Sequence, residues 1–221
     1  VVGARWVVSL LSYFDKDTQA VCGPVAFTGK RVIQQWQRLE LAGLMVLTHG
    51  HILFRVPSLA NGANFAFRKS AYQAVDGYAT QKVVASGDDM LLLHKIAQHY
   101  GGAAVRFAAN QASIVHTPAL ASLQAFWHQR IRWVSKARAY HSLATQLSQG
   151  LAYGANLWVL VLLVAACLAP ELWPVFGAGY VLKSLGEIVL LSCGNIRYTI
   201  ASLLLWVPVL QPIQTLYTII L

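Results

Sequence analysis

The pattern of apolar and polar positions divides the chain into a mixed first part and a largely apolar last part. Before about residue 145, short apolar runs alternate with amphipathic stretches. Strands are expected over 19–27, with a break at Gly23-Pro24, and over 61–67, 103–107 and 112–116. Helices are expected over 5–13, 30–47, 68–75, 88–100 and 120–143. This alternation of strands and helices predicts an α/β sheet.

The last part contains three long apolar stretches, over 151–169, 175–193 and 199–221. Their lengths suit helices that cross a bilayer. The second stretch carries Lys183 and Glu187, whose spacing allows them to pair within the membrane. The third contains Pro208 and Pro212, which membrane helices tolerate. We therefore expect about three transmembrane helices.

Composition strengthens this expectation, because the 221 residues are 57% hydrophobic and only 11% charged. A soluble domain is about one quarter charged. The net charge of +9 could suit nucleic acid. However, the cations gather just before the first apolar stretch, as expected for the cytoplasmic side of a membrane protein. These are Arg130, Arg132, Lys136 and Arg138. We expect a lipid bilayer as a partner and no nucleic acid.

Asp88 and Asp89 stand at the start of the expected helix over 88–100. Ser86 and Asp89 have the spacing of a capping box, and acids in a first turn suit the helix dipole. A carboxylate at a loop end can also line a cleft and remove the proton from an acceptor hydroxyl. The two interpretations are compatible.

The segment Gln129-Arg130-Ile131-Arg132-Trp133 lies in the expected helix over 120–143. Gln129, Arg132, Trp133 and Lys136 share one helical face. An arginine on this face could hold a diphosphate, and the indole could stack on a sugar. The same residues also suit an interfacial helix with its aromatic rings at the lipid headgroups.

Asn61-Gly62-Ala63-Asn64 is a small polar cluster that is typical of a turn. Its small residues would also let the backbone approach a ligand closely. Asp15-Lys16-Asp17 has the form of a metal-binding Asp-x-Asp, but it falls in a loop after the first helix. The cysteines and histidines match no zinc or redox spacing.

Taken in order, these motifs resemble those of membrane-bound family 2 glycosyltransferases, which include cellulose and hyaluronan synthases. The resemblance rests on Asn61 to Asn64, Phe67-Arg68-Lys69, Gly77-Tyr78, Gly87-Asp88-Asp89 and Gln129-x-x-Arg132-Trp133, followed by the apolar stretches. It implies transfer of a sugar from a nucleotide sugar to a polysaccharide or lipid-linked glycan, with inversion at the anomeric carbon. It also implies an integral protein of a bacterial inner or plasma membrane, with its catalytic part in the cytoplasm.

By this resemblance Asp89 is the catalytic base, and Asp88 takes the place usually held by Glu. Gln129, Arg132 and Trp133 contact the acceptor and the nucleotide diphosphate, and Asn61, Gly62 and Asn64 bind substrate. The family uses a divalent cation, Mg²⁺ or Mn²⁺. Its Asp-x-Asp motif would precede Val1, so no metal ligands are expected within this chain.

The expected organisation is therefore an incomplete, Rossmann-like GT-A domain over 1–118, an interfacial helix over 119–145 and a transmembrane region over 151–221. Because the chain starts at Val1 within an apolar stretch, we expect a fragment that is inactive alone. The alternative is a scaffold or transporter subunit that keeps the fold without the chemistry.

Overall fold

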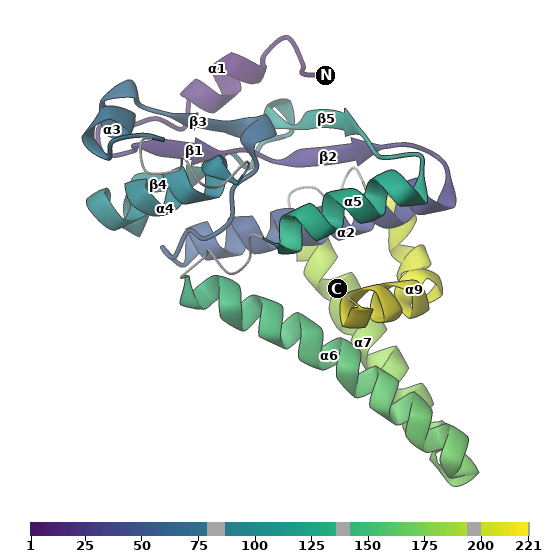
Figure 1. Ribbon diagram of the computed structural model, residues 1–221. Coiled ribbons are helices and arrows are strands. Elements are labelled where there is room, and N and C mark those ends of the chain that lie inside the picture. The colour runs from purple at the N-terminus through teal and green to yellow at the C-terminus, as the bar shows by residue number, and fades with distance from the viewer. Residues whose placement is uncertain (79–86, 136–141, 194–199, 221) are drawn as a thin grey trace.

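The computed structural model describes residues 1–78, 87–135, 142–193 and 200–220, which form a mixed α/β region followed by long apolar helices (Figure 1). The helices of the first region are α1 (Trp6–Leu11), α2 (Val32–Leu53), α3 (Lys69–Ala74), α4 (Asp88–Tyr100) and α5 (Leu123–Val134). Its strands are β1 (Ala20–Cys22), β2 (Val25–Thr28), β3 (Phe65–Phe67), β4 (Val105–Phe107) and β5 (Val115–Pro118). The second region contains α6 (Leu143–Leu168), α7 (Trp173–Cys193) and α9 (Val207–Ile220).

The strands form two small sheets. β1 lies between β3, which is antiparallel to it, and β4, which is parallel to it. β2 pairs in parallel with β5, with Val25 opposite Val115. The two parallel pairs follow one another along the chain, so β1 and β4 lead into β2 and β5 (Figure 1). The predicted α/β region is therefore present, with a mixed sheet and a parallel pair.

Asn64 holds the chain at the break between β1 and β2. Its amide nitrogen donates to the carbonyl oxygens of Pro24 and Ser113, both at 2.8 Å. Its amide oxygen accepts from the indole nitrogen of Trp6 at 3.1 Å. A Cβ on Gly23 would lie 2.3 Å from this amide, so the position requires glycine. The buried Asn64 side chain, with all three of these hydrogen bonds, thus lies against the predicted break at Gly23-Pro24.

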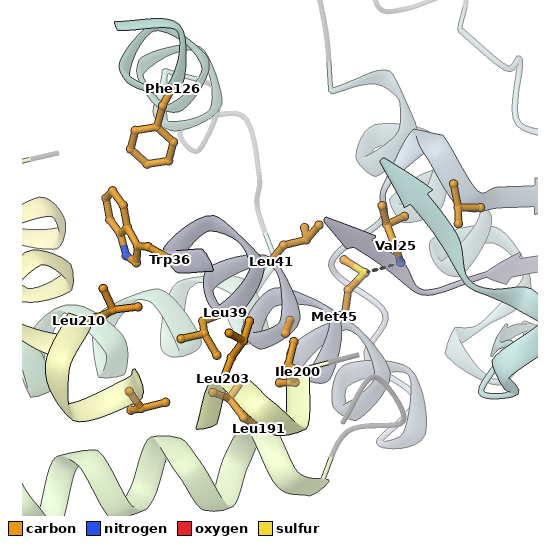
Figure 2. Close-up of a cluster of buried hydrophobic side chains, with 13 residues drawn as sticks. Val25, Trp36, Leu39, Leu41, Met45, Phe126, Leu191, Ile200, Leu203 and Leu210 are labelled. Carbon is orange, nitrogen blue, oxygen red and sulfur yellow. Dashed lines mark hydrogen bonds between the residues drawn. The ribbon is translucent and has the colours of Figure 1, made fainter. Parts of the chain in front are cut away.

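Helix α2 lies between the sheets and the apolar helices (Figure 1). Figure 2 shows the buried hydrophobic cluster around α2. Met45 of α2 approaches Val25 of β2, while Trp36 of α2 lies between Phe126 of α5 and Leu210 of α9. The ring centroids of Trp36 and Phe126 are 4.8 Å apart. Burial of this cluster joins the α/β region to the apolar helices in one core.

Three helical segments are long and apolar enough to cross a membrane: Leu143–Leu168, Pro170–Cys193 and Ala201–Ile220. They indicate membrane association. Lys183 and Glu187 in α7 form the predicted i,i+4 ion pair. The third segment begins with a 3₁₀ stretch, Ala201–Trp206, and Pro212 lies inside α9.

Three predicted helices have clearly different ends in the structure. The first apolar helix, expected from residue 151, already begins at Leu143. Helix α2 continues past residue 47 to Leu53, because Ile52 is buried against the sheet region. The helix expected over 120–143 begins at Leu123, where Ser122 caps it, and ends at Val134. Amphipathic periodicity does not mark such ends, because it records only which face is apolar.

Candidate functional site

A pocket with a volume of about 750 Å³ lies among α2, α4 and α5. One wall, the acidic wall, is formed by Asp88 and Asp89 together with Asn61 and Gly62. Another wall, the cationic wall, is formed by Arg130, Arg132 and Trp133 of α5, with Glu40 of α2 and Tyr217 of α9. The structure therefore brings most of the predicted site residues to one cavity.

The acidic wall is the first turn of α4. Gly87 precedes the helix with a φ of 89°, in the left-handed region that suits glycine. The Asp89 carboxylate accepts the backbone N–H of Gly62 at 2.6 Å and that of Met90 at 2.9 Å. These bonds orient its two oxygens. Asp88, in the same turn, is more exposed to solvent than Asp89.

Burial raises the pKa of Asp89 above the ordinary value of an aspartate. The two backbone N–H groups act in the opposite direction, since they favour the charged form, and the nearby charge of Asp88 adds to the effect of burial. Burial is the largest contribution. Asp89 is therefore a stronger base than a solvent-exposed aspartate would be.

The Asn61–Asn64 segment contributes backbone to the pocket. Its Gly62–Asn64 residues form a 3₁₀ turn that is capped by the Asn61 side chain. A Cβ on Gly62 would lie 3.3 Å from the Asp89 carboxylate, so the small residue allows the close approach of these groups. Asn61 and Gly62 line the pocket, whereas Asn64 is buried at the strand break and is not among its lining residues. The predicted substrate-binding group is thus divided by the fold.

On the cationic wall, Arg132 is exposed in the last turn of α5, and Trp133 is half-buried beside it. Both line the pocket. Gln129 is not among the lining residues. Its side-chain oxygen instead accepts a hydrogen bond from Arg130 at 2.6 Å. Of the predicted motif, Arg132 and Trp133 face the cavity, while Gln129 supports a neighbouring side chain.

The position of Arg130 differs from the one predicted for the basic cluster before the first apolar helix. We expected it at the membrane surface, but its side chain is only 2% exposed. Its Nε donates to the two carboxylate oxygens of Glu40 at 3.0 and 3.2 Å, and its Nη2 donates to the same group. Its guanidinium also lies 4.5 Å from the Phe126 ring centroid and 4.2 Å from that of Trp133. Lys136 and Arg138 lie outside the described residues.

Glu40 also links this wall to the last apolar helix. The Tyr217 hydroxyl donates to Glu40 at 2.9 Å, and the Tyr217 ring packs edge-on against Trp36. Sequence reasoning missed both residues. For Glu40 a signal existed: it is the only acid of α2, and it stands between two leucines. Tyr217 carried no such signal, since an aromatic residue in an apolar stretch is ordinary.

The Asp15-Lys16-Asp17 segment lies in a loop after α1, as predicted. The Asp15 carboxylate accepts the backbone N–H groups of Asp17 and Thr18 and the Thr18 hydroxyl. These bonds, with the Thr18 hydroxyl first, lower the pKa of Asp15 to about 2. Within the described ranges, no three His, Cys, Asp or Glu side chains are grouped so that they could hold a metal ion.

Comparison with protein-family models, with curated proteins and with solved structures found no match for this chain. The chemistry of the pocket is therefore the basis for a functional proposal. A carboxylate with a raised pKa can take a proton, a guanidinium can hold an anion, and an indole can cover a sugar ring.

Proposed function

We propose that this protein is the carboxy-terminal part of a membrane-bound, inverting family 2 glycosyltransferase. It would transfer a sugar from a nucleotide sugar to a polysaccharide or a lipid-linked glycan at the membrane. The supporting observation is that Asp89 of α4 lines the same pocket as Arg132 and Trp133 of α5. The parallel pairs β1–β4 and β2–β5 are consistent with part of a GT-A domain.

In this proposal Asp89 removes the proton of the acceptor hydroxyl as its oxygen attacks the anomeric carbon. The raised pKa suits this task, because a base must hold the proton it receives. Asp88, in the same turn, keeps the mouth of the pocket negative. The role of the base requires Asp89 to be ionised before the acceptor binds.

Arg132 would hold the leaving nucleotide diphosphate, since its planar fork can donate two parallel hydrogen bonds to phosphate oxygens. Trp133 would bound the acceptor site. Its ring is backed by the Arg130 guanidinium on one side, which fixes the orientation of the indole. Gln129 and Glu40 act indirectly, because they hold Arg130 in place.

The resemblance also implies Mg²⁺ or Mn²⁺. The described pocket offers only the carboxylates of Asp88 and Asp89 for such an ion, because the Glu40 carboxylate is already paired with Arg130. Mg²⁺ is usually held by one or two carboxylates together with substrate phosphates and water, so Asp88 and Asp89 would hold such an ion only with those further ligands. The roles proposed above therefore include no step through a metal.

The test is Asp89→Asn in the longest available form of the protein, assayed for sugar transfer in membranes beside the wild type. An amide cannot accept the hydroxyl proton, so transfer should fall by about 10²–10⁴-fold. Binding of the nucleotide sugar should change little, because the amide has nearly the same shape. Asp88→Asn is the matched control. Near-normal transfer by Asp89→Asn, together with loss in Asp88→Asn, would reverse the two assignments. A wild-type protein without transfer would favour a scaffold or transporter subunit.

A further inference from the structure

Helix α2 ends in an apolar tip that no described element covers. Four consecutive exposed residues, Leu53, Phe54, Arg55 and Val56, follow its last buried side chain. Leu53 is 70% exposed, Phe54 is 78% exposed and Val56 is 48% exposed. The chain is buried again at Pro57. Large apolar side chains gathered at one exposed tip usually mark a contact with a membrane or another molecule.

The backbone of this tip is held firmly. The N–H of Val56 donates to the carbonyl of His51 at 2.8 Å, and that of Arg55 donates to Ile52 at 3.0 Å. This is the Schellman pattern of helix ends. Arg55 has a φ of 62°, where glycine is usual. Its carbonyl packs so closely on Gly102 that a Cβ there would lie 1.9 Å from it. The fold thus maintains an unfavourable conformation that projects Leu53 and Phe54 outward.

A hydrogen bond fixes the height of this tip relative to the first apolar helix. His51, in the last turn of α2, bonds to the Ser148 hydroxyl of α6 at 2.9 Å. At about 1.5 Å per residue, Gln149–Leu168 spans roughly 30 Å, which is the thickness of the hydrocarbon core of a bilayer. Ser148 therefore lies at the boundary of that core, and the end of α2 lies beside it (Figure 1).

The start of α6 also exposes large apolar side chains at this level. Leu143, Leu147 and Leu151 recur every four residues, and they are 67%, 58% and 74% exposed. This stripe runs through the level of Ser148 into the apolar length of the helix. Exposed apolar side chains on both α2 and α6, at the level of the bond between His51 and Ser148, favour lipid as their neighbour.

We propose that the Leu53–Val56 tip inserts into the interfacial region of the bilayer that α6 crosses. Leu53 and Phe54 would enter the upper acyl region, and the Arg55 guanidinium would contact lipid phosphates. The tip would act as a second anchor, which holds α2 and the pocket at a set height above the lipid. This inference does not depend on the glycosyltransferase proposal.

The test uses single-cysteine variants labelled with the environment-sensitive dye NBD. The three natural cysteines are replaced by alanine, and the protein is reconstituted into vesicles of phosphatidylcholine and phosphatidylglycerol. Phe54→Cys should give blue-shifted emission that is quenched most by lipids spin-labelled at a shallow acyl position. Leu157→Cys, within α6, should be quenched most by a deep spin label. Val8→Cys is the matched control, because Val8 is 69% exposed on α1, which lies across the sheets from α2 (Figure 1).

The label at residue 8 should resemble dye in water. If the label at residue 54 behaves in the same way while that at residue 157 is lipid-exposed, the tip does not enter the bilayer and the proposal is wrong. If the label at residue 157 also resembles dye in water, α6 does not cross these membranes, and the proposal for the tip is again wrong. Shallow quenching at residue 54 that weakens in Arg55→Gln would support the contact between Arg55 and phosphate.

Discussion

The two walls of the pocket are held by different kinds of interaction. On the acidic wall, backbone N–H groups orient Asp89, one from its own helix and one from the turn at Gly62. On the cationic wall, side chains from α2, α5 and α9 hold one another through Glu40, Arg130 and Tyr217. The acidic wall therefore depends on local backbone geometry, whereas the cationic wall depends on the docking of an apolar helix against the α/β region.

Two arginines on α5 make the same distinction at closer range. Arg130 and Arg132 are two residues apart, so their side chains leave the helix about 200° apart. Arg130 points into the core and is neutralised by Glu40. Arg132 is exposed at the pocket, where an anionic ligand could meet it. The two arginines thus differ in role although they carry the same charge. Arg130 stabilises the fold, and Arg132 is proposed to bind a ligand.

The largest expected effect is on the cationic wall. Arg130→Gln should lower the free energy of unfolding by about 3–5 kcal/mol, because it leaves the Glu40 carboxylate buried without its partner. Equilibrium unfolding in detergent micelles, followed by tryptophan fluorescence, measures this. Arg106→Gln is the matched control, since the Arg106–Asp15 pair is about half-exposed and should contribute little. Similar losses in both variants would show that burial of the Arg130 pair has no special importance.

The support of the acidic wall should be the next most sensitive. Asn64→Ala removes its hydrogen bonds with Trp6, Pro24 and Ser113. The Pro24 carbonyl still accepts the N–H of Val115 at 3.0 Å, so the loss falls mainly on the Ser113 carbonyl and the Trp6 indole. We expect a loss of roughly 3 kcal/mol in the same unfolding assay. Asn61→Ala, which removes only the cap of the 3₁₀ turn, should cost about 0.5–1 kcal/mol. A larger loss in Asn61→Ala than in Asn64→Ala would contradict the structural role of Asn64.

A smaller effect is expected where α9 joins the cationic wall. Tyr217→Phe keeps the ring contacts with Trp36 and removes only the hydroxyl that donates to Glu40. The free energy of unfolding should fall by about 1 kcal/mol. Tyr153→Phe, at a half-exposed position on α6, should be silent. If both variants are silent, the hydrogen bond between Tyr217 and Glu40 does not contribute to stability.

The smallest effect concerns the pH dependence of stability. The pKa of Asp89 is raised by burial, so the folded state binds its proton more tightly than the unfolded chain does. Stability should therefore fall as the pH rises above 3.8, the ordinary value, until Asp89 is ionised. Asp89→Asn should flatten this slope in unfolding measurements made across the pH range.

Asp15 should contribute a slope of the opposite sign to the pH profile, and Asp15→Asn should remove it. The pKa of Asp15 is lowered to about 2, so its contribution is present above 3.8 and is lost as the pH falls towards about 2. Removing this carboxylate should make the protein less sensitive to acid. Equal slopes for wild type and both variants would mean that neither environment alters stability.

Much of the local structure could be predicted from patterns in the sequence. The helix over Asp88–Tyr100 has the predicted bounds, and the strand break at Gly23-Pro24 and the pairing of Lys183 with Glu187 are confirmed. These features depend on neighbouring residues alone, through helix periodicity, proline geometry and i,i+4 spacing. The predicted ends of α2 and α5 were less accurate, because burial against distant segments decides where a helix stops.

The sequence by itself determined the order of the elements, the three apolar helices and the presence of an acidic pair and an Arg-Trp pair. Only the tertiary structure decided which of these side chains share a cavity. It buried Arg130 against Glu40, assigned Asn64 to the strand break and brought Tyr217 of the last helix to the pocket. The physical reason is that burial and pairing are set by contacts between residues far apart in the chain, and no local pattern encodes such contacts.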